Sequence, residues 1–292
     1  MLRWWIAPAA VLLVGGLGVA VLAALGAPLR LLAMNLGATL ASAILLPLFA
    51  TAGRRAWRHP TVTLLGVVAA IWVTALWGAD LEGVRRWARL GPFLFHVGFL
   101  GLPIALAMLP RTAWPAGLLG AGLIGAGLVA QPDGGTALAF ATGAAVHVAL
   151  RRSAGSLVWI AVAVIAAAAA WLRPDPLPAV QFVEQVGRLA VGRSPALGVL
   201  AFLALALPSA ALAIAAWRER DVSGVAAPAA GFWFGAAAAS LLGNYPTPIV
   251  GAGVTPVLAY ALTWAIIVTA RDAAARTRTS PRGSPGSAAS PP

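Results

Sequence analysis

Long apolar runs dominate the chain, and short stretches between them hold most of the charged side chains. A helix needs about 20 apolar residues to cross the hydrocarbon core of a bilayer. Counting runs of roughly this length predicts an all-α polytopic membrane protein, with ten transmembrane helices in a single domain over residues 1–270. The predicted spans are residues 4–25, 28–50, 61–79, 92–110, 113–130, 133–150, 155–172, 195–217, 228–243 and 253–270.

The composition agrees with this pattern and excludes a soluble domain. Of the 292 residues, 61% are hydrophobic and 10% are charged, whereas soluble domains carry roughly 25% charged residues. There are no cysteines, which excludes disulfides and thiolate chemistry. The net charge of +12 is typical of nucleic-acid binding. However, the arginines lie at the ends of apolar runs, so we exclude a nucleic-acid partner and expect membrane lipids instead.

The arginines also predict how the chain is oriented. All 20 basic residues are arginine. If the N-terminus is cytoplasmic, 13 arginines lie on the cytoplasmic side and 7 lie outside, which is the bias expected for this orientation. We therefore predict that both termini are cytoplasmic. Residues 271–292 are rich in Arg, Ser, Pro and Ala, cannot bury a core, and are expected to form a disordered cytoplasmic tail.

An acidic residue stands between two apolar runs in the segment Gln131–Thr136. Pro132 disfavours the helical conformation at Gln131 and is expected to end the fifth span there. Asp133 is then placed to cap the sixth span by accepting the backbone N–H of Gly135 or Thr136. The alternative is that Asp133 forms a polar wall of an outward-facing cavity, since ionisable groups at membrane depth are commonly functional.

The predicted outer loop 80–92 contains three arginines around a tryptophan. Arg85, Arg86 and Arg89 fall on neighbouring positions of a helix that would include Trp87. Arginine forks suit phosphate oxygens and indole suits the headgroup layer, which favours a diphosphate on a lipid carrier as ligand. The alternative is an interfacial anchor, with acidic residues of the same loop paired to these arginines.

The predicted outer loop 173–194 contains an amphipathic segment that we expect to form a short helix on the membrane surface. In such a helix Glu184 and Arg188 would form an i,i+4 ion pair. Asp175, which stands between two prolines, is expected to shape a turn. His96 and His147 are isolated in apolar spans, so we predict no metal site, and each is expected to be a packing residue.

The segment 244–256 is apolar but rich in proline and glycine. Irregular backbone of this kind survives at membrane depth only when it is buried in protein or lines a cavity. Pro248, Gly253 and Thr255 could therefore belong to a binding site of the kind that broken helices form in transporters. An ordinary kinked loop is the alternative.

In order and spacing, these segments resemble the SEDS family (shape, elongation, division and sporulation), whose members include FtsW and RodA. Gly83–Pro92 resembles the Gly-Ala-Arg-Trp segment before the family's fourth span, and Gln131–Thr136 resembles its Gln-Pro-Asp-Leu-Gly-Thr motif. Pro174–Gly192 resembles the start of the large outer loop, and Pro246–Pro256 resembles the Pro-Leu-Pro-Phe turn.

The resemblance implies a ten-span enzyme of the bacterial plasma membrane that polymerises peptidoglycan from lipid II. It implies a polyprenyl-diphosphate-linked glycan as ligand and a single-span partner such as a class B penicillin-binding protein, with no cofactor. The candidate substrate-binding residues are Arg85, Arg86, Trp87, Arg89, Gln131, Asp133, Pro248, Gly253 and Thr255.

The chain departs from the family pattern where the family is charged. After Gly91-Pro92 the family carries Gln-Pro-Ser-Glu and then a lysine. In this chain Phe99 stands at the position of the family's glutamate, and Leu102 stands at the position of its lysine. The family's large outer loop continues to a Thr-Asp-Phe segment that bears the aspartate taken as catalytic. Here the chain runs from Arg193 directly into the next span, so that aspartate has no counterpart.

These departures indicate a shortened, degenerate relative that acts in cell-wall formation, cell shape or cell division through lipid-linked substrate or partner binding. Two alternatives stay open. One is an active glycosyltransferase with a relocated base, for which Asp133, Glu184 and Asp175 are the candidates. The other is a transporter of a lipid carrier or small solute, built on the broken helices of residues 244–256.

Overall fold

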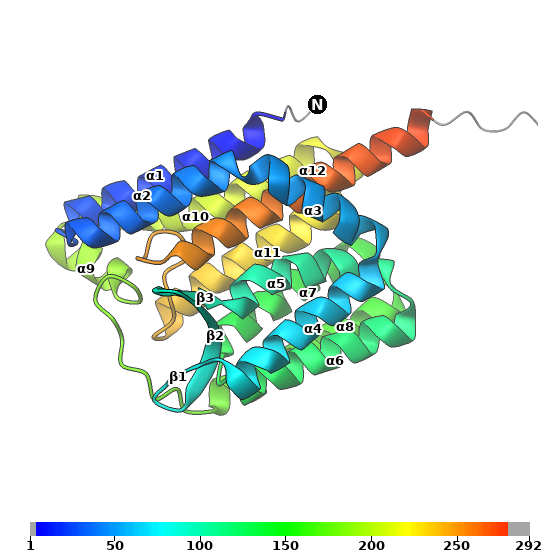
Figure 1. The fold of residues 1–292 in the computed structure, drawn as a ribbon, viewed down its shortest axis with the longest axis horizontal. Coiled ribbons are helices and arrows are strands. Elements are labelled where there is room, and N and C mark those ends of the chain that lie inside the picture. Colours follow the sequence, from blue (N-terminus) through cyan, green and yellow to red (C-terminus); the bar gives the residue numbers. More distant parts are fainter. Residues whose placement is uncertain (1–3, 280–292) are drawn as a thin grey trace, which may run out of the picture.

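The computed structural model describes residues 4–279 and is a bundle of helices that run mostly side by side, with a small β-sheet at one end (Figure 1). The helices are α1 (Ile6–Ala24), α2 (Leu29–Ile44), α3 (Leu46–Arg58), α4 (Pro60–Trp77), α5 (Val97–Met108), the 3-10 turn η1 (Leu109–Arg111), α6 (Trp114–Ala130), α7 (Gly134–Arg151), α8 (Ala154–Leu172), α9 (Val186–Arg193), α10 (Pro195–Arg218), α11 (Arg220–Leu242) and α12 (Val254–Thr279).

Each of the ten apolar segments predicted from the sequence contains a helix, which confirms a polytopic all-α membrane fold. By length and composition, six of the described helices are long and apolar enough to cross a membrane. The pair α2 and α3 makes a seventh span if it is counted as one bent helix. Helices α5 and α6 are shorter and apolar.

The second predicted span is broken in the middle. Helices α2 and α3 meet at Leu45 and are bent by 59°. Pro47 lies in the first turn of α3, where its missing N–H costs little, and it cannot continue the hydrogen bonds of α2. Proline is a usual cause of sharp kinks, and it accounts for this one.

The predicted helix around Trp87 is wrong, because residues 79–96 form a three-stranded antiparallel sheet. Its strands are β1 (Ala79–Leu81), β2 (Val84–Leu90) and β3 (Phe93–His96), in the order β1-β2-β3. The pairs Leu81–Val84 and Leu90–Phe93 each leave two residues for the turn. Glu82 and Gly83 both have positive φ, and Gly91 has positive φ at the head of the second turn. These are the conformations that tight hairpins require.

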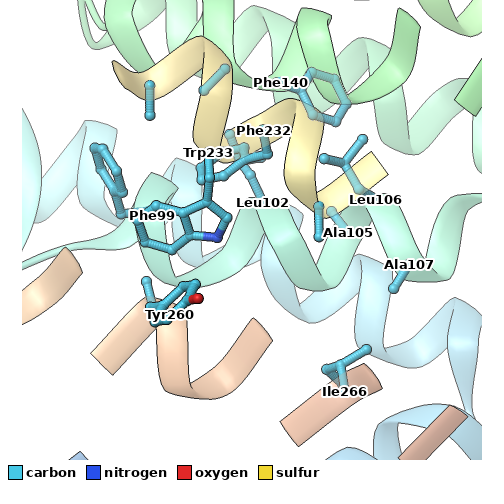
Figure 2. Close-up of a cluster of buried hydrophobic side chains, with 14 of the residues drawn as sticks. Phe99, Leu102, Ala105, Leu106, Ala107, Phe140, Phe232, Trp233, Tyr260 and Ile266 are labelled. Atoms are coloured by element: carbon cyan, nitrogen blue, oxygen red, sulfur yellow. The ribbon is translucent and has the colours of Figure 1, made fainter. Parts of the chain in front are cut away.

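Helix α5 lies inside the bundle and carries much of the core. Phe99 and Leu102 on α5 lie beside aromatic side chains of α11, and Leu106 lies beside Phe140 of α7 (Figure 2). Phe99 lies 5.9 Å from Phe232 and 6.2 Å from Trp233 between ring centroids. Because offset and edge-on aromatic pairs add to the free energy of burial, this cluster fixes α5 against α11.

Helix α12 is longer than predicted and runs to Thr279. Residues 271–279 are therefore helical, and the prediction of disorder is wrong for them. The helix extends because Arg271–Thr279 contains no helix breaker, and near its end Arg278 forms an ion pair with Asp221 of α11. The rest of the predicted tail, residues 280–292, lies outside the described residues.

Candidate functional site

Four segments that are far apart in the sequence meet at the end of the bundle that holds the β-sheet, here called the hairpin end (Figure 1). They are the sheet itself, the junction between α6 and α7 (residues 131–136), the segment 174–185, and the turn 244–253. Hydrogen bonds or ion pairs connect all four. These are the segments that carry the resemblance to the SEDS motifs.

The junction between α6 and α7 folds as the sequence predicts. Helix α6 ends at Ala130, with Gln131 as C-cap. Asp133 is the N-cap of α7 and accepts the backbone N–H of Thr136 at 3.2 Å. The side-chain amide of Gln131 donates to the carbonyl oxygen of Ile71 at 2.8 Å, which fixes the junction to α4.

The carboxylate of Asp133 also contacts a histidine that the sequence analysis assigned only to packing. His96 Nε2 lies 3.3 Å from Asp133 Oδ2, and both side chains are buried. His96 is itself the N-cap of α5, since its Nδ1 accepts the backbone N–H of Phe99 at 3.4 Å. Both ring nitrogens are therefore engaged. The two residues are distant in the sequence, and only the pairing of β2 with β3 brings His96 to the α6–α7 junction.

A tyrosine explains the two glycines of the Gln131–Thr136 motif. A Cβ atom on Gly134 would lie 2.5 Å from the hydroxyl oxygen of Tyr245, and one on Gly135 would lie 2.5 Å from its ring. Tyr245 packs against Trp171 at 5.2 Å between ring centroids, with the two rings tilted by 44°. Burial raises the pKa of the Tyr245 hydroxyl to about 12, so it stays neutral beside Asp133.

Arg86 connects the sheet to two other segments. It is buried, and its guanidinium donates to Asp175 Oδ2 at 2.8 Å and to the carbonyl oxygen of Pro132 at 3.2 Å. It also lies over the ring of Trp87 at 4.7 Å. Asp175 accepts the backbone N–H of Leu177 as well, which confirms its predicted turn. Arg86 is thus a structural connector whose charge is already neutralised.

The other two arginines of the sheet are exposed. Arg85 pairs with Asp80 at 2.9 Å, which agrees with the anchor interpretation. The N–H of Gly83 and then the Arg85 guanidinium lower the pKa of Asp80. Arg89 has no ion pair with any residue in the described part of the chain, so it is the arginine of this sheet that stays available to an anion.

Residues 247–252 of the turn 244–253 are buried against protein, as irregular backbone in this position requires. The Asn35 side chain on α2 donates to the carbonyl oxygen of Gly251 at 3.0 Å and accepts the N–H of Gly253 at 2.9 Å. Backbone N–H groups of Thr247 and Ala252 donate to the segment 182–183. Pro248 lies inside this clamped turn.

Thr255 joins the turn to the sheet. Its hydroxyl accepts the backbone N–H of His96 at 3.1 Å and donates to the carbonyl oxygen of Leu94 at 3.3 Å. A cavity of about 290 Å³ opens beside it, and Trp87, His96 and Gly253 line its wall together with Thr255. None of the described lining residues is a carboxylate; the others are apolar residues, prolines, glycines and Thr247.

Glu184 is not the surface ion-pair partner predicted from the sequence. It lies in a turn before α9, which begins only at Val186, and its carboxylate accepts the backbone N–H of Val180 at 2.7 Å. Burial raises the pKa of Glu184, although the N–H of Val180 acts in the opposite direction. It lines a different cavity, of about 550 Å³, between α9, α10 and α11.

Four buried polar atoms near the α6–α7 junction make no hydrogen bond to a described residue: Arg86 Nε, Gln131 Oε1, Asp133 Oδ2 and Thr136 Oγ1. Of these, Asp133 Oδ2 has the 3.3 Å contact with His96 Nε2, whose geometry is not that of a hydrogen bond. Buried polar atoms are usually satisfied, and exceptions mark places that water or a ligand occupies. The described residues contain no group of three His, Cys, Asp or Glu side chains that could hold a metal ion. A small polar ligand or water therefore suits this junction better than a metal.

The fold and these contacts define a polytopic all-α membrane protein with a polar junction at one end. No protein-family model and no curated protein matches the chain by sequence. Two crystal structures of the rod shape determining protein RodA from Thermus thermophilus match it in three dimensions. The unaltered RodA gives 23% identity and a TM-score of 0.66, and an aspartate-to-alanine mutant gives 21% and 0.65.

Both matches cover 92% of this chain and 97% of the RodA chain. RodA is a member of the SEDS family, so the resemblance found in the sequence is confirmed for the fold: this is a SEDS-like, multi-pass membrane protein.

Proposed function

We propose that this protein binds a polyprenyl-diphosphate-linked glycan in the bacterial plasma membrane and works in cell-wall formation without polymerising glycan itself. A class B penicillin-binding protein is the kind of single-span partner expected for it. One observation carries the proposal: the cavity beside the SEDS-like motifs has no carboxylate among its described lining residues. Activation of a sugar hydroxyl requires a base within hydrogen-bond reach. His96 is the one titratable side chain among the described lining residues, and both of its ring nitrogens are engaged, by the N–H of Phe99 and by Asp133.

The interior of the bundle supports the same proposal. At the two positions where the family carries glutamate and lysine, this chain has Phe99 and Leu102, which are 4% and 0% exposed. Phe99 belongs to the aromatic cluster of Figure 2. Because apolar side chains fill these two positions, neither of them can supply a titratable group to the site. Asp175 is paired with Arg86, and Glu184 lies in another cavity.

A polymerisation assay tests the catalytic part. Purified protein supplied with lipid II should give no glycan strands, and SEDS enzymes assayed in parallel should give them. Robust strands from this protein would overturn the proposal. They would favour the second candidate, a relocated base, because His96 lines the cavity and Asp133 lies directly behind it. In that case Asp133→Asn should abolish polymerisation while the protein still folds.

A binding assay tests the ligand. Arg89 is exposed and has no ion pair with the described residues, so it is the arginine expected to meet the diphosphate. Arg89→Gln should weaken binding of a labelled polyprenyl-diphosphate disaccharide about fivefold or more. Arg193→Gln, which removes one exposed arginine elsewhere on the same predicted side, is the matched control. Equal affinity for both variants and the unaltered protein would count against this site.

A further inference from the structure

The end of the bundle opposite the sheet carries arginines that have no carboxylate partner. Arg54, Arg55 and Arg58 lie in the last turns of α3, and Arg111 lies in η1 beside them. None of these four forms an ion pair with a described residue. By contrast, the arginines at the end of α12 are partly neutralised, since Arg271 contacts Asp272 and Arg278 contacts Asp221.

Helix α3 has the surface of an interfacial helix. Its buried residues Leu46, Ala50 and Gly53 share one face, at the spacing of a helix stripe. The opposite face starts with Leu48, which is 62% exposed, and ends with exposed Arg55 and Arg58. The exposed surface therefore changes from apolar to cationic along the helix, as it does where a helix passes from hydrocarbon to headgroups.

The length of the broken span puts this cationic turn at the membrane surface. Helix α2 has 16 residues and α3 has 13, which at a rise of about 1.5 Å per residue gives roughly 43 Å of helix. The hydrocarbon core is only about 30 Å thick. The bend of 59° tilts α3 away from the axis of α2. The surplus length then lies in the headgroup layer instead of projecting into water.

The turn that follows α3 is held rigid. The Arg111 guanidinium stacks on the Trp57 ring at 3.8 Å and donates to the Trp57 carbonyl oxygen at 3.4 Å. The Thr63 hydroxyl donates to the carbonyl oxygen of Ala56 at 3.3 Å, which ties the first turn of α4 to the end of α3. Arg111 is therefore held beside the end of α3, and a preorganised cation loses less conformational entropy when it binds an anion.

We propose that this corner, formed by the end of α3, η1 and the start of α4, binds the phosphate of an anionic phospholipid. Guanidinium forks suit phosphate oxygens, the exposed Leu48 face suits an acyl chain, and the free N–H groups at the start of α4 add a favourable dipole. The inference is independent of the proposed glycan ligand, which would bind at the other end of the bundle. The predicted orientation places the corner on the cytoplasmic side, where anionic lipid attracts basic residues.

The test measures the thermal unfolding temperature of the full chain in neutral detergent, titrated with phosphatidylglycerol, phosphatidylcholine or soluble glycerol phosphate. Phosphatidylglycerol should raise it saturably, and the other two should not. In the double variant Arg55→Gln/Arg58→Gln, the half-saturating phosphatidylglycerol concentration should rise about tenfold or more. The double variant Arg151→Gln/Arg152→Gln removes the same charge from another corner of the same end and should behave as the unaltered protein.

Three results would overturn the proposal: an unchanged half-saturation in Arg55→Gln/Arg58→Gln, an equal loss in the control variant, or equal stabilisation by glycerol phosphate. The variant Arg55→Lys/Arg58→Lys keeps the charge and guards against a folding defect. It should keep most of the phosphatidylglycerol effect, with some loss because a lysine cannot form the bidentate fork. Failure of this variant to respond at all would also contradict a phosphate site.

Discussion

Asp133 holds a helix end and a buried histidine with one carboxylate. One oxygen accepts the N–H of Thr136, and the other lies 3.3 Å from His96 Nε2. The capping role was predictable because it depends on residues next to one another in the sequence. The contact with His96 was not, because it depends on the register of a hairpin whose strands were mistaken for a helix.

Substitutions of Asp133 separate its two roles. Asp133→Asn keeps an acceptor for the N–H of Thr136, so we expect helix α7 to stay capped. Asp133→Ala removes the acceptor, and we expect a loss of about 1 kcal/mol or somewhat more in the free energy of unfolding. Denaturation in mild detergent measures the free energy of unfolding of both variants. If the alanine variant is as stable as the asparagine variant, the cap contributes nothing and this interpretation is wrong.

Glu184 should make stability depend on pH. Burial raises its pKa above the ordinary value of 4.5, so the folded protein binds this proton more tightly than the unfolded chain. Stability is then greatest below pH 4.5 as far as this group is concerned, and falls as the pH rises through the folded-state pKa. Thermal unfolding from pH 4 to 8 should show this decline in the unaltered protein and a flatter profile in Glu184→Gln. The same slope in both proteins would assign the effect to another group.

Among the secondary-structure elements, the sheet is the one whose type was predicted wrongly, although the sequence contains the turn signals of its hairpins. Trp87 and its neighbouring arginines fit a helix by spacing, but Glu82-Gly83 and Gly91-Pro92 are two-residue turn signals at the right distance for hairpins. Reading these turns first would have favoured strands. The clamp of Asn35 on Gly251 and Gly253 could not be found in this way, because nothing local in α2 points to a turn near the other end of the chain.

The start of α7 depends on a close fit between Gly135 and Tyr245. A Cβ atom at Gly135 would lie 2.5 Å from Tyr245 Cδ1, so Gly135→Ala should destabilise the protein by roughly 1–3 kcal/mol. In a Tyr245→Ala background the two shortest contacts are absent, and only the contact of 3.1 Å with the Cβ of residue 245 remains. The same change should then be neutral or stabilising by up to about 1 kcal/mol, because alanine favours helix over glycine.

A double-mutant cycle measures this coupling from the unfolding free energies of the four proteins. Gly37→Ala on α2 is the control, since a Cβ there meets nothing within 4 Å. It should be neutral or slightly stabilising in either background. Additive effects of Gly135→Ala and Tyr245→Ala would show that the tyrosine does not explain the glycine.

At the scale of the whole molecule, the arrangement of spans follows from the length of the apolar runs, while the site follows from contacts between distant segments. Ten runs predicted ten helical segments, and the structural match with RodA covers 92% of the chain. The bend between α2 and α3 was missed although Pro47 marks its position in the sequence. The extension of α12 was missed because the ion pair of Arg278 with Asp221 joins residues that are distant in the sequence. The orientation of the bundle rests only on the arginine count and needs an experiment of its own.

The absence of cysteine makes that experiment direct, because any introduced thiol is the only one in the chain. With both termini cytoplasmic, a membrane-impermeant maleimide added to intact spheroplasts should label Arg89→Cys, whose exposed position lies in the sheet. It should label Arg58→Cys, an exposed position at the opposite end, only after the membrane is permeabilised. The reverse pattern would show that the chain has the orientation opposite to the predicted one. The sheet and its cavity would then face the cytoplasm, and the arginine corner of α3 would face outwards. One labelling result therefore decides which side of the membrane each proposed site faces.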